Sequence, residues 1–397
     1  MDIVILADFC GRFDKSDNSR FTYLANMLKE NHQVEIITSD FSHGRKCYFE
    51  GVPTNYPYKI TMLHEGEYKK NVCLQRFKAH YIWGKNVIEY LKQRKKPDVI
   101  YCSIPPLTAP YEAAKYCEEN NIKFIIDVQD LWPEAFQMVF NIPVVSDIIF
   151  APFKFLANGI YKRADKVVAV SQTYVNRALQ ENKKCASGDV VFLGTNMDTF
   201  DESVRNAKIN IEKNPDEVWL AYCGTLGHSY NLTIVLEALK LLKDKGVTGF
   251  RFIVMGTGPL ESNFKELATK YDLPVTFTGK LPYDEMCAQL KICDIAINPI
   301  VKGAAQSIIN KHADYAMSGL PVVSTQEAME YRNLLDEYKC GINCGVESVE
   351  DVANAIERLI NDEALRVEMG KNSRKLGEER FDRKKSYKNI VNAIEKD

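Results

Sequence analysis

Apolar residues recur along the chain in short unbroken runs, and longer stretches with helical spacing separate them. Unbroken rather than alternating apolar runs are typical of parallel strands covered on both faces. The alternation therefore predicts right-handed strand–helix–strand units and doubly wound sheets. The predicted strands are 3–7, 34–38, 99–102, 124–128, 167–170, 190–193, 219–223, 252–255, 275–278, 295–298, 321–324 and 341–343, and predicted helices include 21–30, 107–120, 232–245 and 352–361.

A polar stretch at 198–216 interrupts the alternation, and we interpret it as a linker between two Rossmann-like halves. The chain has 397 residues, more than the roughly 250–300 that a single core usually supports. We predict an N-terminal domain at 1–200 and a C-terminal domain at 201–379. The basic helical run at 380–397 either ends the second domain or crosses back to the first. Ligands of doubly wound sheets bind outside the carboxyl ends of the strands, so we expect a site in the cleft between the domains.

Composition narrows the function classes. The net charge of -2 excludes a globally basic nucleic-acid binder. Eleven cysteines without a Cys-x-x-Cys pair, and six dispersed histidines, suggest neither a disulfide framework nor a zinc site. We therefore expect a reduced, cytoplasmic protein with no metal. The N-terminus lacks the features of a signal peptide, and no stretch has the length and apolarity of a membrane-spanning helix.

The first half offers three candidate residues at strand ends. Gly11 follows the first predicted strand, where a glycine lets backbone amides approach an anion; a plain strand-to-helix turn is the alternative. Asp127 lies at the end of the strand at 124–128 and Asp130 follows it, at a strand end where carboxylates bind hydroxyls or assist proton transfer. The alternative for Asp130 is a cap on a helix that has Pro133 at an early position.

The second half repeats glycines at strand ends. Gly224 and Thr225 follow one predicted strand, while Gly256 and Gly258 follow the next. Glycines between a strand and a helix permit close approach of a phosphate or sugar. Each pair by itself is a weak signal.

The most informative segment is 298–321. A predicted strand ends near Asn298, and a helix at about 306–318 follows a loop of small residues. The amides at a helix start carry partial positive charge suited to a diphosphate. Lys311 supplies a cation, and Asp314 three residues later shares its side of the helix; an ordinary surface ion pair is the alternative. The loop and helix start comprise Ala304, Ala305, Gln306 and Ser307.

A basic and aromatic run occupies 68–96, with nine basic residues and one acidic residue. It is compatible with an anionic membrane surface or lipid headgroups, and equally with a solvated helix face. No other feature supports a nucleic-acid partner. The residues that define this candidate membrane or acceptor patch are Arg76, Lys78, Trp83 and Lys85.

In order and spacing, the motifs resemble those of retaining GT-B glycosyltransferases of family 4, also called group 1, of the bacterial surface-polysaccharide type. The resemblance covers nearly the whole chain. Its carriers are the Gly11 loop and segments 23–25, 31–34, 130–134, 194–198, 222–227, 255–259 and 311–321. It implies an α/β GT-B fold in which two doubly wound Rossmann-like domains face a central cleft.

The resemblance also implies site roles. The second domain would bind a nucleoside-diphosphate sugar, with UDP or GDP expected, and the first a glycan or lipid-linked acceptor; no metal or other cofactor is expected. Lys311 would neutralise the diphosphate, and Asp314 would hold the ribose. Gly11, Gly224, Thr225 and residues 304–307 would line the diphosphate, and backbone near Lys280 and Leu281 would meet the base.

The implied activity is retaining sugar transfer to a lipid-linked or growing glycan of a bacterial surface polysaccharide, in the cytoplasm or at the inner face of the membrane. The chain departs from the family pattern, which often has two glutamates at the positions of Gln306 and Asp314, an Arg–Lys pair at Thr225 and Tyr230, and a histidine at Gln129. A non-catalytic partner subunit that binds glycan or stabilises an active transferase is therefore one alternative. A nucleotide-sugar epimerase of the same fold is another.

Overall fold

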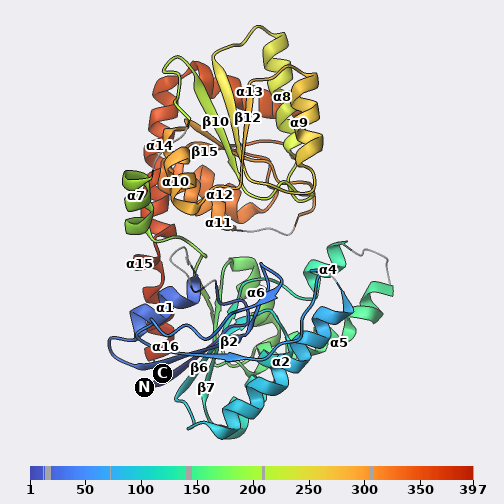
Figure 1. The fold of residues 1–397 in the computed structure, drawn as a ribbon, viewed down its shortest axis with the longest axis vertical. Coiled ribbons are helices and arrows are strands. Elements are labelled where there is room, and N and C mark those ends of the chain that lie inside the picture. The colour runs from blue at the N-terminus through green and yellow to red at the C-terminus, as the bar shows by residue number, and fades with distance from the viewer. Residues whose placement is uncertain are drawn as a thin grey trace. The chain divides into compact units, whose positions relative to one another are not determined.

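The chain forms two compact units, each an open sheet with helices on both faces (Figure 1). The computed structural model describes residues 1–11, 13, 19–71, 73–139, 145–207, 211–304 and 308–396. One unit comprises Met1–Phe192 with Tyr387–Asp397, and the other comprises Leu193–Ser386. The second unit thus begins before the predicted boundary at 200 and extends beyond 379.

The described strands of the first unit form a parallel sheet in the order β5-β2-β1-β6-β7-β8-β9. The unbroken apolar runs predicted these strands except β5, which has an exposed lysine and partly exposed residues on an edge. Their bounds are β1 (Asp2–Leu6), β2 (Gln33–Ser39), β5 (Lys59–Leu63), β6 (Val99–Ile104), β7 (Lys123–Val128), β8 (Lys166–Ala169) and β9 (Asp189–Val190); β3 (Phe41–Ser42) and β4 (Cys47–Tyr48) form a separate antiparallel pair.

Helices cover both faces of the first sheet. Helices α2 and α3 pack together, and α3 contacts β6, β7 and α5. On the other face, Ile3 and Ile5 share a core cluster with Leu24 and with Ile390 of the last helix, so α16 completes this core. The helices are α1 (Arg20–Leu28), α2 (Leu74–Gln93), α3 (Thr108–Asn120), α4 (Glu134–Val139), α5 (Val145–Arg163), α6 (Gln172–Glu181) and α16 (Lys388–Glu395).

The described strands of the second unit form a parallel sheet in the order β12-β11-β10-β13-β14-β15. All of them were predicted from the apolar runs. Their bounds are β10 (Val218–Cys223), β11 (Phe250–Met255), β12 (Val275–Gly279), β13 (Ile295–Asn298), β14 (Val322–Ser324) and β15 (Gly341–Asn343).

Helices α8, α9 and α13 share one core cluster with this sheet (Figure 1), and α10, α11 and α14 pack in series elsewhere in the unit. The helices are α7 (Met197–Asn206), α8 (Leu232–Asp244), α9 (Glu261–Lys270), α10 (Tyr283–Ile292), α11 (Asn310–Ser318), α12 (Met329–Tyr338), α13 (Val349–Asn361), α14 (Glu363–Leu376) and α15 (Arg383–Ser386), with the π-helical turn η1 (Gly377–Phe381) after α14.

The predicted linker at 198–216 is wrong over its first half, because helix α7 occupies it. The Asn196 side chain accepts a hydrogen bond from the Thr199 amide and caps the helix. Phe200 is its buried anchor, and Arg374 binds both carboxylate oxygens of Asp201 at 2.8 and 2.7 Å. One buried apolar residue in ten gives too weak a periodicity to predict a helix.

Among the described residues, no helix has the length and apolarity needed to cross a bilayer.

A buried ion pair joins three segments of the first unit. Arg20 of α1 donates to both carboxylate oxygens of Asp127 at the end of β7, at 2.7 and 3.1 Å. Its remaining nitrogen donates to the carbonyls of Val191 and Phe192 beyond β9. Both side chains are buried. Each charge is therefore stabilised by the other instead of by water.

We expect Asp127→Asn to lower the free energy of unfolding of the first unit by about 3–5 kcal/mol, because it leaves the Arg20 charge buried without its partner. Urea unfolding measures this. The matched control is Glu118→Gln, which removes an exposed ion pair with Arg163 and should cost less than about 1 kcal/mol. Equal midpoints for the two variants would contradict the structural role of the pair.

Candidate functional site

Two strand-end turns of the second unit lie against each other. Leu226 donates its amide to the Thr257 carbonyl at 3.0 Å, and Gly224 donates to Met255 at 2.9 Å. A side chain at Gly256 would strike the Gly224 carbonyl, and one at Gly258 would strike the backbone of Leu226. Close backbone packing therefore explains Gly256 and Gly258 without a ligand, and their predicted contact with the donor stays a prediction.

Lys311 lies in the first turn of α11 rather than one turn into it. The helix begins at Asn310, not near 306 as predicted. The side chain is 7% exposed, and its Nζ lies 4.1 Å from the ring centre of Tyr222 and 3.7 Å from that of Tyr230. A Cβ at Gly224 would lie 3.0 Å from the same Nζ. A side chain at position 224 would therefore crowd the ammonium.

In the part of the chain that the structure describes, the enclosed Lys311 ammonium forms no ion pair. Among the described residues, its Nζ has no hydrogen-bond partner and is shielded from solvent. Burial lowers the pKa of Lys311 to about 7. An ammonium carries three donors, so an anionic ligand with several oxygens would supply what the protein does not.

Asp314 is also buried, which excludes the alternative of an ordinary surface ion pair with Lys311. The Tyr283 hydroxyl donates to Asp314 Oδ1 at 2.9 Å and lies 2.8 Å from the Thr195 hydroxyl. Burial raises the pKa of Asp314 to about 6, although the Tyr283 hydrogen bond opposes the shift. Asp314 and Lys311 therefore contact different partners.

The remaining predicted donor residues have varied surroundings. Thr225 is exposed, and its carbonyl accepts a hydrogen bond from the Tyr222 hydroxyl at 2.8 Å. Lys280 and Gly11 are exposed, and Leu281 is half-buried. Ala304 is described, whereas Ala305, Gln306 and Ser307 lie outside the described residues.

The two predicted aspartates of the first unit have different surroundings. Asp127 is fully buried and paired with Arg20, which is at odds with a role in orienting an acceptor. Asp130 accepts hydrogen bonds from the Leu131 amide at 2.9 Å and the Trp132 indole at 3.2 Å. Burial raises the pKa of Asp130. The predicted role of Asp130 in orienting an acceptor stays a prediction.

The four residues of the predicted basic patch lie on two faces of helix α2, one buried and one exposed. Arg76 and Trp83 are buried, at 7% and 1% exposure, so they do not belong to a surface patch. Lys78 and Lys85 are exposed. Residues seven apart lie on the same side of a helix, so each pair shares one face and the composition of the run does not distinguish the faces.

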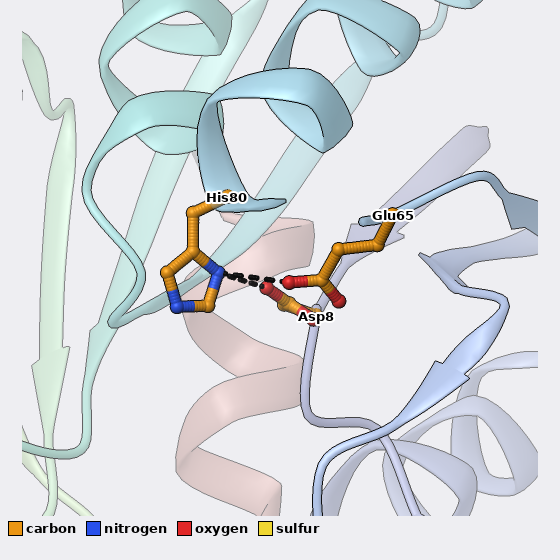
Figure 2. Close-up of side chains that lie close together, drawn as sticks. All are labelled: Asp8, Glu65 and His80. Atoms are coloured by element: carbon orange, nitrogen blue, oxygen red, sulfur yellow. Dashed lines mark hydrogen bonds and ion pairs between the residues drawn. The ribbon is translucent and has the colours of Figure 1, made fainter. Parts of the chain in front are cut away.

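Sequence reasoning missed a buried cluster formed by Asp8, Glu65 and His80 (Figure 2). His80 Nδ1 lies 3.1 Å from Asp8 Oδ2 and 3.1 Å from Glu65 Oε1. The Ser39 hydroxyl donates to Glu65 at 2.6 Å. Burial and the Glu65 charge raise the pKa of Asp8. Asp8 lies just beyond the carboxyl end of β1, and this nearness to a strand end, which also drew attention to Asp127 and Asp130, is the signal that could have found it.

The donors of this cluster suit a proton better than a metal ion. Arg76 Nε donates to His80 Nε2 at 3.1 Å, so the imidazole proton lies on Nδ1, facing the carboxylates. A metal on Nδ1 would move that proton to Nε2, against the Arg76 donor. Metal-bound histidines normally direct the other nitrogen at an acceptor. The cluster also fixes Arg76, whose guanidinium lies 4.7 Å from the Trp132 ring centre.

The match to a known protein family lies within the second unit. Residues 203–376 match the family described as Glycosyl transferases group 1. An uncharacterized glycosyltransferase of Methanocaldococcus jannaschii is 27% identical over 248 residues, which is 61% of this chain and 61% of that protein. The putative colanic acid biosynthesis glycosyltransferase WcaL of Escherichia coli K12 is 28% identical over 171 residues, 42% of this chain and 40% of WcaL. The chain thus matches less than two thirds of the length of each relative.

Solved structures extend the likeness to both units. HepE of Anabaena in complex with UDP has a TM-score of 0.71 at 15% identity, over 99% of each chain, and HepE has also been solved with UDP-glucose. Sucrose-phosphate synthase of Thermosynechococcus elongatus has a TM-score of 0.75 at 13% identity, over 99% of this chain and 98% of that one. These matches confirm the two-unit α/β GT-B fold.

We expect Lys311→Met to raise the melting temperature by about 3 °C or more, because it removes an unpaired buried cation. The unfolded state holds the lysine proton to about pH 10 while the folded state releases it near 7, so wild-type stability rises with pH across that window. The gain should therefore be largest below pH 7 and shrink towards pH 10. Thermal unfolding at several pH values measures it.

Lys240→Met is the control, because Lys240 is substantially exposed and pairs with Asp244 on the surface. It should change the melting temperature little at any pH. A lower melting temperature for Lys311→Met than for wild type at pH 6 would contradict this account. It would show that the protein itself stabilises the Lys311 charge without a ligand.

Proposed function

We propose that the chain is a retaining glycosyltransferase that moves a hexosyl group from a nucleoside-diphosphate sugar to a hydroxyl of a lipid-linked or growing glycan in surface-polysaccharide synthesis. The observation that carries the proposal is the Lys311 ammonium, which is buried at the start of α11 and has no hydrogen-bond partner among the residues that the structure describes. Family and relatives place glycosyl transfer among the expected chemistries. A diphosphate is the anion that such a donor presents to a protein cation.

The donor site is assigned to the second unit. The Lys311 ammonium and the free amides of the first turn of α11 would meet the diphosphate. Asp314 would accept a ribose hydroxyl, once it is ionised above its pKa of about 6. UDP is the favoured nucleotide because HepE, which shares the fold, has been solved with UDP and with UDP-glucose; GDP remains the second candidate.

The reaction needs no group beyond these residues and the two substrates. The acceptor oxygen attacks the anomeric carbon from the face that the diphosphate leaves, forming the new glycosidic bond as the bond to phosphate breaks. A donor phosphate oxygen takes the hydroxyl proton. Charge grows on the diphosphate as the bond breaks, and Lys311 and the helix amides stabilise it most at that point. Asp130 would orient the acceptor hydroxyl.

One surface of the first unit has features suited to a membrane, which supports a lipid-linked acceptor. The outer face of α2 carries exposed Lys78, Tyr81 and Lys85, and Ile148 and Phe155 of α5 are exposed by 71% and 66%. Phe77 of α2 lies 4.8 Å from Phe153 of α5, measured between ring centres, so the two helices adjoin. Cations beside exposed apolar side chains are typical of proteins that rest on anionic bilayers. The name of WcaL supports the polysaccharide pathway.

We expect purified protein to transfer sugar from a UDP- or GDP-sugar to a lipid-linked acceptor with retention at the anomeric carbon. Lys311→Ala should lower the single-turnover rate by about 10²–10³-fold, as for loss of one preorganised charge donor. Lys240→Ala, on the surface of α8, should leave the rate unchanged. Released nucleotide and the anomeric configuration by NMR are the measurements.

The outcomes separate the candidate functions. Donor binding without transfer to any acceptor would favour a non-catalytic partner subunit. Conversion of the donor sugar without an acceptor would identify an epimerase. An unchanged rate for Lys311→Ala would remove Lys311 from the chemistry.

We expect the protein to bind vesicles that contain anionic lipid and to leave them as salt is raised. Replacing both Lys78 and Lys85 by Glu should abolish flotation with such vesicles at low salt. Lys184→Glu, a single charge reversal elsewhere on the first unit, should have little effect. Absence of wild-type binding at low salt would rule out docking through this face.

A further inference from the structure

Two tyrosines from different segments enclose the Lys311 ammonium. Tyr222 belongs to β10 and is fully buried, whereas Tyr230 precedes α8 and is half-buried. Their ring centres are 5.8 Å apart and the rings are nearly perpendicular, at 67°. The inner wall of the enclosure is therefore fixed in the core, and the outer wall lies nearer the surface.

The enclosure attracts a cation but does not satisfy it. The faces of aromatic rings are electronegative and hold an ammonium by cation–π attraction. They supply no oxygen, and the three ammonium donors have no hydrogen-bond partner among the described residues. The same walls exclude water, which is the usual substitute. Such a site favours the neutral amine until an anion is present.

We propose that Tyr222 and Tyr230 are positioning residues that keep Lys311 out of water and favour its neutral amine until the donor arrives, so that donor binding at pH 8 takes up nearly one proton. The proposal rests on the proposed function. Tyr230 moves aside, diphosphate oxygens replace its ring, and the amine takes a proton from solvent to become an ammonium. No covalent bond of the donor changes in this step.

Apart from Asp314, the titratable groups nearby stay in one state around neutral pH. Burial raises the pKa of the Cys223 thiol to about 12 and raises that of Tyr222. Burial lowers the pKa of His312, the next residue on α11, well below its usual value. Asp314 changes charge near pH 6 and faces Tyr283. Proton uptake above that range therefore reports on Lys311.

Isothermal titration calorimetry in buffers of different ionisation enthalpy counts the protons taken up. UDP-glucose and GDP-glucose are the probes, because their diphosphates are diesters and stay fully ionised between pH 6.5 and 9. With a free pKa of about 7, uptake at pH 8 should be about 0.9 proton, and the affinity should fall about tenfold per pH unit above 8.

Two substitutions at Tyr230 separate a positioning role from a structural one. Tyr230→Phe keeps the ring face and should keep the proton uptake. Tyr230→Ser admits water to the amine, raises its pKa and should reduce uptake at pH 8 by at least half, flattening the pH profile. Lys311→Met should bind weakly with no uptake. Melting curves verify that each variant is folded.

Two results would overturn the proposal in distinguishable ways. Binding by wild type with no proton uptake at pH 8, or with uptake unchanged in Tyr230→Ser, overturns the cage alone and leaves the donor site intact. Failure of wild type to bind either nucleotide sugar overturns the proposed function together with the cage.

Discussion

A cation held in protein without an anion is costly, because the energy lost in leaving water is not recovered from a partner. The second unit is arranged around such a group. Helix α11 delivers the Lys311 side chain, a glycine at 224 leaves space for its end, and two aromatic rings close around it. The core formed by the sheet and helices α8 and α13 must supply the stability that this arrangement removes.

The first unit treats buried charge differently. The Arg20 guanidinium meets Asp127 through two hydrogen bonds, and His80 lies between the carboxylates of Asp8 and Glu65. Paired groups of this kind are explained by the fold itself. The unpaired ammonium of the second unit therefore says more about ligand binding than the paired charges of the first unit do. A buried group without a partner among the described residues implies a partner that arrives from outside.

The fold was predictable because parallel strands buried on both faces leave unbroken apolar runs, as in β10 and β13. The position of Lys311 followed from the same pattern, since a strand, a loop and a helix in sequence place it near a strand end. The pairing of Asp127, which is at odds with its predicted role, was not predictable because its partner, Arg20, lies 107 positions away, and the local sequence holds no sign of the pairing. Arg76 and Trp83 were placed on the surface because a helix with cations on two faces gives one basic run, whichever face is buried.

Glu65 was missed for a related reason. Glu65 follows β5, an edge strand. The exposed positions of β5 give it a sequence pattern that resembles a loop. His80 is one of several helical residues that could face inward, and only the packing of α2 selects it. Tyr230 drew notice as a departure from the family pattern, but its contact with Lys311 depends on the segment before α8 meeting the start of α11 in space.

Helix α16 has a consequence for biogenesis. Tyr387, Ile390 and Ile394 complete the core that begins with Ile3 and Ile5, so the second unit is, in topological terms, an insertion within the first. On the ribosome, the earlier strands must wait for nearly two hundred further residues before their hydrophobic surface is closed. The inserted unit has all its own strands by then and is free to fold ahead of its host. The nascent first unit is therefore the part most exposed to chaperones during synthesis.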